Sequence, residues 1–135
     1  MNPAKYLNCL SMQAVVDEND IPLKSRNGKQ LYRLTAPLSF YSAELDIIVT
    51  APTDFITDLD STPRLPIVYL LMNAFGDMPA ATHDYVYSTG IFPRAQCDAL
   101  LREACLATGV PKWQASVAYY SVRMGGGSHY VPAKT

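Results

Sequence analysis

The sequence lacks both an excess of charge of one sign and a long apolar run. Eleven Lys and Arg residues are balanced by 12 Asp and Glu residues, so the net charge is −1. The basic residues are scattered, and we therefore expect no nucleic-acid partner. The longest apolar stretch, residues 65–75, is interrupted by Pro66, Tyr69 and Asn73. A membrane-spanning helix needs about 20 apolar residues, so we expect no transmembrane segment.

Cysteine is scarce, and a secretory signal is missing. The first ten residues show no basic region followed by an apolar core, and we therefore expect the protein to be made in the cytoplasm of the cell that produces it. The three cysteines form no CxxC pair, which favours reduced thiols over a disulfide framework. Cys97 and Cys105 have helical spacing, and we interpret them as small core residues.

The first half of the chain carries strand signals. Apolar residues make up 49% of the 135 residues, enough for one domain with a buried core. Short runs rich in β-branched and aromatic residues predict strands over residues 30–35, 38–41 and 45–50. A polar turn at residues 42–44 would join the last two as a hairpin. We expect one small antiparallel sheet.

After Pro52 the pattern becomes helical. Proline or a capping residue stands near the start of each segment and glycine just after its end, as is typical of helices. The predicted helices cover residues 64–74, 78–88, 93–107 and 111–124. A short turn around Gly90 should make the second and third an antiparallel hairpin. Strands followed by about four short helices predict an α+β fold.

Carboxylates gather between the last predicted strand and the first predicted helix. Asp54, Asp58 and Asp60 fall within seven residues, and such oxygen ligands bind hard cations. Alternatively, the helix is capped by Asp60, Ser61 or Thr62, and Asp58 pairs with Arg64. We interpret Asp58 as a candidate metal ligand, and Asp60, Ser61 and Arg64 as supporting loop residues.

A histidine and an aspartate are placed to meet across the helical hairpin. His83 lies seven residues before Gly90, and Asp98 lies eight residues after it. At the helical rise both are roughly 10–12 Å from the turn and level with each other. Tyr87 follows His83 by four residues and shares its helical face. We therefore expect His83 and Asp98 to come into contact.

Such a pair has a chemical use and a structural alternative. A carboxylate that accepts one imidazole N–H leaves the other nitrogen to act as a general base or a metal ligand. Asp84 points about 100° further around the helix and can hold calcium or zinc beside that base. His83, Asp98 and Tyr87 are the candidate catalytic residues, with Arg94 in support. In the alternative, the His83–Asp98 pair only clamps two helices.

From about residue 31 to residue 130 the chain resembles the DUF1353 family, small proteins encoded mostly in bacteriophage and prophage genomes. The matching segments are Phe55-Ile56-Thr57-Asp58, Ser61, Pro63 and Arg64, His83-Asp84-Tyr85-Val86-Tyr87, Arg94, Asp98, Gly109-Val110, Val122-Arg123 and Gly126-Gly127. The resemblance implies one domain over residues 31–135, preceded by an N-terminal extension over residues 1–30. It also implies a phage origin among lysis or tail genes, and it carries over no activity.

Over about sixteen residues the helical pair is also similar to that of secreted phospholipase A2. That family carries His-Asp-x-x-Tyr on one helix and an Asp on the antiparallel partner, as His83, Asp84, Tyr87 and Asp98 do here. The likeness implies that His83 activates water, Asp84 holds calcium and Asp98 orients His83. The glycine-rich, cysteine-bearing calcium loop and the disulfides of that family are missing.

Three functions remain open on this basis. The first is a metal-assisted hydrolase that acts on cell-envelope material, lipid or peptidoglycan. The second is a structural protein of the virion tail or connector, with other virion proteins or a second copy as partners. The third is a binding protein that inhibits a host factor. In each case the protein is made in the host cytoplasm, and in the second it ends in the virion.

Overall fold

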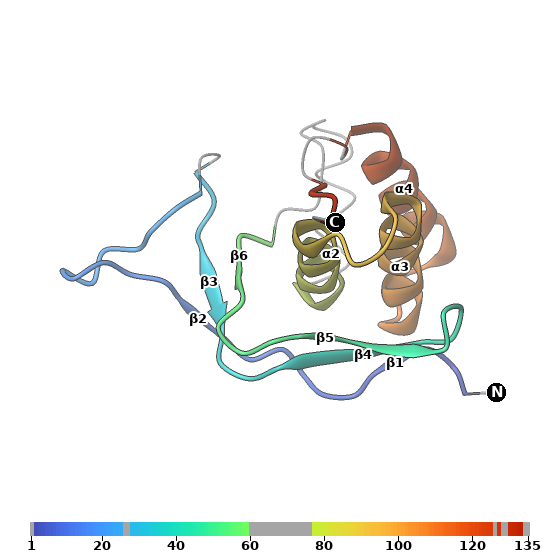
Figure 1. Ribbon diagram of the computed structural model, residues 1–135, viewed down its shortest axis with the longest axis horizontal. Coiled ribbons are helices and arrows are strands. Elements are labelled where there is room, and N and C mark those ends of the chain that lie inside the picture. The colour runs from blue at the N-terminus through green and yellow to red at the C-terminus, as the bar shows by residue number, and fades with distance from the viewer. Residues whose placement is uncertain (1, 26–27, 60–76, 126, 128–129, 134–135) are drawn as a thin grey trace.

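The computed structural model describes residues 2–25, 28–59, 77–125, 127 and 130–133. These residues form two three-stranded antiparallel sheets and three helices (Figure 1). The strands are β1 (Lys5–Tyr6), β2 (Met12–Ala14), β3 (Tyr32–Leu34), β4 (Leu38–Ser42), β5 (Ile47–Ala51) and β6 (Ile56–Thr57). The helices are α2 (Asp77–Thr89), α3 (Arg94–Ala107) and α4 (Lys112–Gly125).

The α+β class is confirmed, with three helices rather than four in the described part of the chain. The helix predicted over residues 64–74 lies outside the described residues. The other three predicted helices match α2, α3 and α4 to within one or two residues at each end. Their boundaries follow local signals, because proline fits a first helical turn and glycine fits the position after the last one.

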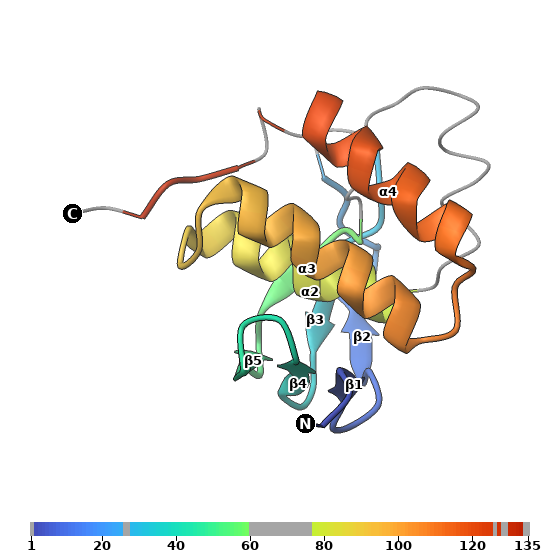
Figure 2. The same ribbon diagram turned by 90° about the vertical axis from the view of Figure 1, so that its right-hand side faces the viewer.

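The predicted hairpin of helices is also confirmed. α2 and α3 pack against each other and run in opposite directions (Figure 2). Gly90 ends α2 with a left-handed φ of 63°. A Cβ atom there would lie 2.3 Å from the backbone nitrogen of Ala133 and 2.3 Å from the carbonyl oxygen of Val131. The turn therefore needs glycine both for its conformation and for the close passage of the C-terminal segment.

The expectation of a single sheet is wrong, because the strands divide into two. β4 and β5 form the predicted hairpin, paired from Leu38↔Ala51 to Ser42↔Ile47. β3, however, pairs with β2 and β6 and does not join them. The chain bends at residues 35–37 between β3 and β4, where Pro37 has no N–H to continue a ladder.

Residues 1–30, interpreted from the sequence as an extension, supply strands to both sheets. β1 pairs with β4 at the edge of one sheet, and β2 pairs with β3 at the edge of the other. Beyond β2, residues 15–25 and 28–31 form an arm that projects from the body (Figure 1). Within the arm Val15 donates to Leu31, Leu31 to Leu23 and Leu23 to Val15 through their backbones.

The helices lie over the β1–β4–β5 sheet in two layers. α2 and α3 contact the sheet, and α4 packs on α3 on the side away from it (Figure 2). Phe40 and Val49 from the sheet meet Val86, Leu100 and other buried side chains of the helical hairpin. This arrangement explains the alternation of buried and half-buried residues along β4, since successive strand residues face opposite sides.

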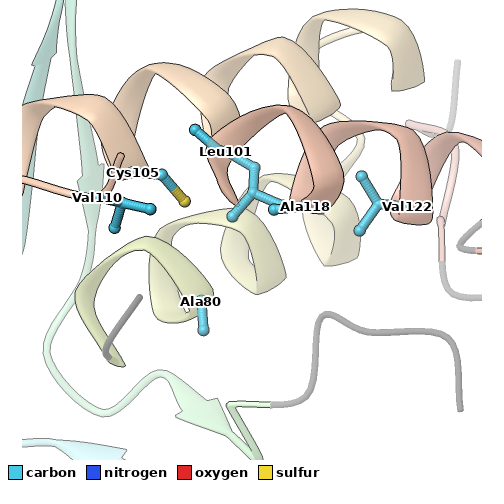
Figure 3. Close-up of a cluster of buried hydrophobic side chains, with 7 residues drawn as sticks. Ala80, Leu101, Cys105, Val110, Ala118 and Val122 are labelled. Carbon is cyan, nitrogen blue, oxygen red and sulfur yellow. The ribbon is translucent and has the colours of Figure 1, made fainter. Parts of the chain in front are cut away.

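The inner face of α4 is made of small side chains. Ala115, Ala118 and Val122 are fully buried against Leu101 and Cys105 of α3 (Figure 3). Burial raises the pKa of the Cys105 thiol to about 12. Cys97 is equally buried, and its pKa is also raised to about 12, by burial first and by the Asp98 charge second. Both cysteines are core residues, as predicted.

Candidate functional site

The site is built around the carboxylate of Asp98, which is fully buried on α3. One oxygen, Oδ1, lies 3.0 Å from His83 Nε2 and accepts a hydrogen bond from Tyr87 Oη at 2.5 Å. The other, Oδ2, accepts one from Arg123 Nη1 at 2.9 Å and lies 4.0 Å from Arg94 Nε. Three helices therefore converge on one carboxyl group.

The helical hairpin brings these groups together. His83 and Tyr87 are one turn apart on α2, and their ring centroids lie 4.1 Å apart. The antiparallel turn at Gly90 sets both rings level with Asp98 on α3. The contact that the sequence predicts between His83 and Asp98 is confirmed, whereas the catalytic roles of His83, Asp98 and Tyr87 remain predictions.

Hydrogen bonds keep Asp98 ionised in spite of its burial. Burial by itself would raise the pKa of this carboxyl group, because a low-dielectric interior disfavours the charge. Donors from His83, Tyr87 and Arg123 outweigh that effect, and the pKa lies below its ordinary value of 3.8. An ionised Asp98 requires His83 to donate its Nε2–H, so the basic lone pair of a neutral imidazole is on Nδ1.

Tyr87 acts as a link between Asp98 and Arg94. Its hydroxyl donates to Asp98 Oδ1 and accepts from Arg94 Nε at 3.1 Å. Burial, and then the hydrogen bond to the Asp98 carboxylate, raise the pKa of Tyr87 above its ordinary value of 10.0. The phenol therefore stays protonated at neutral pH and holds Asp98 in place.

Arg94 closes the cluster on the α4 side. Its Nη2 donates to the carbonyl oxygens of Val122 at 2.7 Å and of Arg123 at 2.9 Å. These carbonyls belong to the last turn of α4, where a cation interacts favourably with the helix dipole. Arg94, which the sequence predicts as a supporting residue, therefore also connects α3 to α4.

Sequence reasoning missed Arg123 as a partner of Asp98. Its side chain is 34% exposed and makes the ion pair with Asp98 Oδ2. The hydrogen bond to that carboxylate raises the pKa of Arg123. The sequence did hold a signal for this pair. A buried aspartate rarely lacks a cationic partner, and Arg123 is the basic residue in the last turn of α4.

The two predicted metal ligands, Asp84 and Asp58, belong to different elements of the structure. Asp84 is half-buried on α2 and Asp58 is half-buried just after β6. No three His, Cys, Asp or Glu side chains cluster for a metal among the residues that the structure describes. Asp60, Ser61 and Arg64 lie outside the described residues. The metal-binding roles of Asp84 and Asp58 therefore remain predictions.

The fold and the site together define a class of small α+β proteins with a buried His–Asp–Tyr–Arg cluster between packed helices. The chain belongs to the DUF1353 family, described as a protein of unknown function, whose profile matches residues 32–122. The match includes His83, Tyr87, Arg94 and Asp98. No curated protein and no solved structure matches the chain. None of the described helices has the length and apolarity to cross a bilayer.

Proposed function

We propose that the protein is a phage-encoded hydrolase that cleaves ester bonds in cell-envelope lipid, with His83 as the general base. The contact of 3.0 Å between His83 Nε2 and Asp98 Oδ1 carries this proposal. With an ionised Asp98 it favours the tautomer of His83 that carries its proton on Nε2, and the carboxylate supplies a stabilising charge next to the ring. A buried carboxylate in this position is what an imidazole base needs.

The reaction follows from these groups. His83 Nδ1 takes a proton from water while the water oxygen attacks the ester carbonyl carbon. Asp98 stabilises the imidazolium that forms. The proton then passes from His83 to the alcohol oxygen as the ester C–O bond breaks, which yields a fatty acid and an alcohol. Tyr87, Arg94 and Arg123 are positioning residues that hold Asp98.

Two resemblances favour lipid as the substrate. The His-Asp-x-x-Tyr pattern with an antiparallel aspartate is similar to the helical pair of secreted phospholipase A2, and DUF1353 proteins are encoded mostly by phages that must breach an envelope. No step is assigned to a cation, because the described residues do not form a site for one.

The test is release of fatty acid from detergent-dispersed phosphatidylglycerol and phosphatidylethanolamine. His83→Gln is the informative variant, since its amide keeps an N–H donor for Asp98 but has no basic nitrogen. Loss of a general base lowers the rate by about 10²–10⁴-fold. Lys24→Gln, at an exposed position of the arm that follows β2, is the matched control and should keep the wild-type rate. A wild-type protein that releases no fatty acid would contradict the proposal.

A second candidate, a structural protein of the virion tail or connector, is favoured by the depth of the cluster. His83 is only 1% exposed and Asp98 is not exposed at all. In this role the cluster clamps α2, α3 and α4, and the partners are other virion proteins or a second copy. The protein would then be present in purified particles and would form an assembly in solution. A monomer that is absent from particles and releases fatty acid would exclude this role.

A further inference from the structure

The outer face of α4 carries an apolar stripe that no described part of the chain covers. Trp113 is 57% exposed, Tyr120 is 61% exposed and Met124 is 84% exposed. With half-buried Val117 they follow the spacing i, i+4, i+7 and i+11, which places them within one narrow arc of a helix. We call these four residues the α4 stripe.

The α4 stripe is opposite the face that packs on α3. The buried residues of that inner face are Ala115, Ala118 and Val122, which lie about half a turn away from the stripe. Figure 3 shows the inner face directed at α3. α4 is thus apolar on two sides, although contact with α3 requires only one. Packing within the described chain does not explain the large side chains of the stripe.

The two charged side chains of α4 itself are both basic. The helix contains Lys112 and Arg123 and no Asp or Glu. Arg102 of α3 lies above the ring of Tyr119, 5.9 Å from its centroid. Arg123 is paired with Asp98, and the helical positions of Lys112 and Tyr119 put Lys112 and Arg102 along one edge of the stripe. An apolar face of Trp, Tyr and Met with a basic edge complements an anionic lipid surface.

We propose that α4 is a docking surface for an anionic lipid bilayer, on which it lies in the plane of the headgroups. Trp and Tyr prefer that interfacial layer because they combine an apolar body with a polar tip. A stable protein dimer usually uses about 20–30 residues on each side, far more than the stripe provides. Each inserted side chain contributes separately to binding at a membrane surface. The proposal does not depend on catalysis by His83.

The chain has its own reporter for this test, because Trp113 is its single tryptophan. The full-length protein is titrated with vesicles of phosphatidylglycerol and phosphatidylethanolamine, and Trp113 emission and vesicle co-sedimentation are measured. We expect a blue shift of the emission and quenching by brominated acyl chains. Binding to pure phosphatidylcholine vesicles should be roughly tenfold weaker, since the basic edge then has no anionic partner.

The variant Y120S/M124S leaves Trp113 in place and should weaken vesicle binding by at least about tenfold. Ile48→Ser is the matched control, because Ile48 is 56% exposed on β5, and α2 and α3 lie between that sheet and α4 (Figure 2). It should bind within about twofold of wild type. Wild-type protein that leaves vesicles unbound would overturn the proposal. Self-association without lipid that Y120S/M124S abolishes would also overturn it and would identify a second copy as the occupant.

Vesicle binding and lipid hydrolysis are separated by their variants. H83Q should bind vesicles as wild type does, because α4 is intact. Y120S/M124S should still cleave detergent-dispersed lipid, because His83 and Asp98 are intact. Wild-type protein that does not bind vesicles overturns the docking surface. Wild-type protein that does not hydrolyse lipid overturns the proposed hydrolase.

Discussion

The helical side and the strand side of this protein are held together in different ways. α2, α3 and α4 converge on one buried carboxylate that receives hydrogen bonds from His83, Tyr87 and Arg123. The two sheets have only two to five residues in each strand and are tied to the helices by separate polar contacts. A single substitution should therefore lower the free energy of unfolding more when it falls in the helical cluster than when it falls at one contact of the sheets.

The largest effect is expected from Asp98→Ala. This change leaves His83, Tyr87 and Arg123 without their shared acceptor, and removing one partner of a buried ion pair costs about 3–5 kcal/mol. Because Arg94 and Arg123 are partly exposed, we expect about 3 kcal/mol, measured by urea unfolding. Arg102→Ala, also on α3, should lose less than about 1 kcal/mol. Equal losses in the two variants would contradict the central position of Asp98.

The same carboxylate should give the helical side an acid-sensitive component. The pKa of Asp98 is lowered in the folded state, so its contribution is fully present above its ordinary value of 3.8 and is lost as pH falls through the lower folded value. Asp98→Asn should be less stable than wild type at pH 7, and the difference should shrink below pH 4. A constant difference from pH 7 to pH 2 would argue against an ionised Asp98.

Glu103→Gln tests a polar contact between the β4–β5 hairpin and α3. Glu103 accepts from Ser42 Oγ at 2.6 Å and from the backbone nitrogen of Glu44 at 3.0 Å, which joins the β4–β5 turn to α3. Loss of the charge at two such bonds should cost about 1–2 kcal/mol. Amide hydrogen exchange should accelerate at residues 43–46 and stay unchanged in α4. Faster exchange throughout α4 would mean that the two sides are not separate.

Tyr6→Phe tests the hydrogen bond that joins the N-terminal strand β1 to α2. The Tyr6 hydroxyl is hydrogen-bonded to Thr82 Oγ1 of α2 at 2.7 Å, while its ring lies 4.8 Å from that of Phe40. The variant keeps the ring contact and loses one hydrogen bond, at a cost of about 1 kcal/mol. Tyr6→Ala removes both and should cost at least twice as much by urea unfolding. Similar values for the two variants would show that the ring contact contributes nothing.

The smallest effect is expected when calcium is added to the protein. The described residues offer Asp84 and Asp58 without a third clustered ligand, so we expect calorimetric binding no tighter than the millimolar range. Asp84→Asn should weaken it further. Sub-micromolar binding of calcium or zinc by the wild type would contradict this and would restore the metal-assisted mechanism that the sequence suggested.

The helical hairpin was predictable because its signals are local. Proline and glycine mark its ends, and the helical rise places His83 opposite Asp98 by counting residues from Gly90. The family match over residues 32–122 agrees with the resemblance read from the same motifs. The ion pair of Asp98 with Arg123 depends on how α4 packs on α3, and residue spacing does not specify that.

The division into two sheets was not predictable from the sequence. β1 and β2 have only two and three residues, too few to show an alternating pattern, and they form because β4 and β3 offer partners distant in sequence. Strand propensity depends strongly on such context. The exposure of Trp113 and Tyr120 is likewise not specified by the sequence, since aromatic residues on a helix usually mark its buried face.

The tautomer of His83 tests the central claim most directly. Two-dimensional ¹⁵N spectra of the imidazole nitrogens resolve the two histidines of the chain, with His129→Gln used to assign them. A neutral His83 that is protonated at Nε2 and donates to Asp98, and that becomes a mixture of tautomers in Asp98→Ala, is the predicted result. A His83 protonated at Nδ1, or one that is the same in both proteins, would contradict the proposed centre.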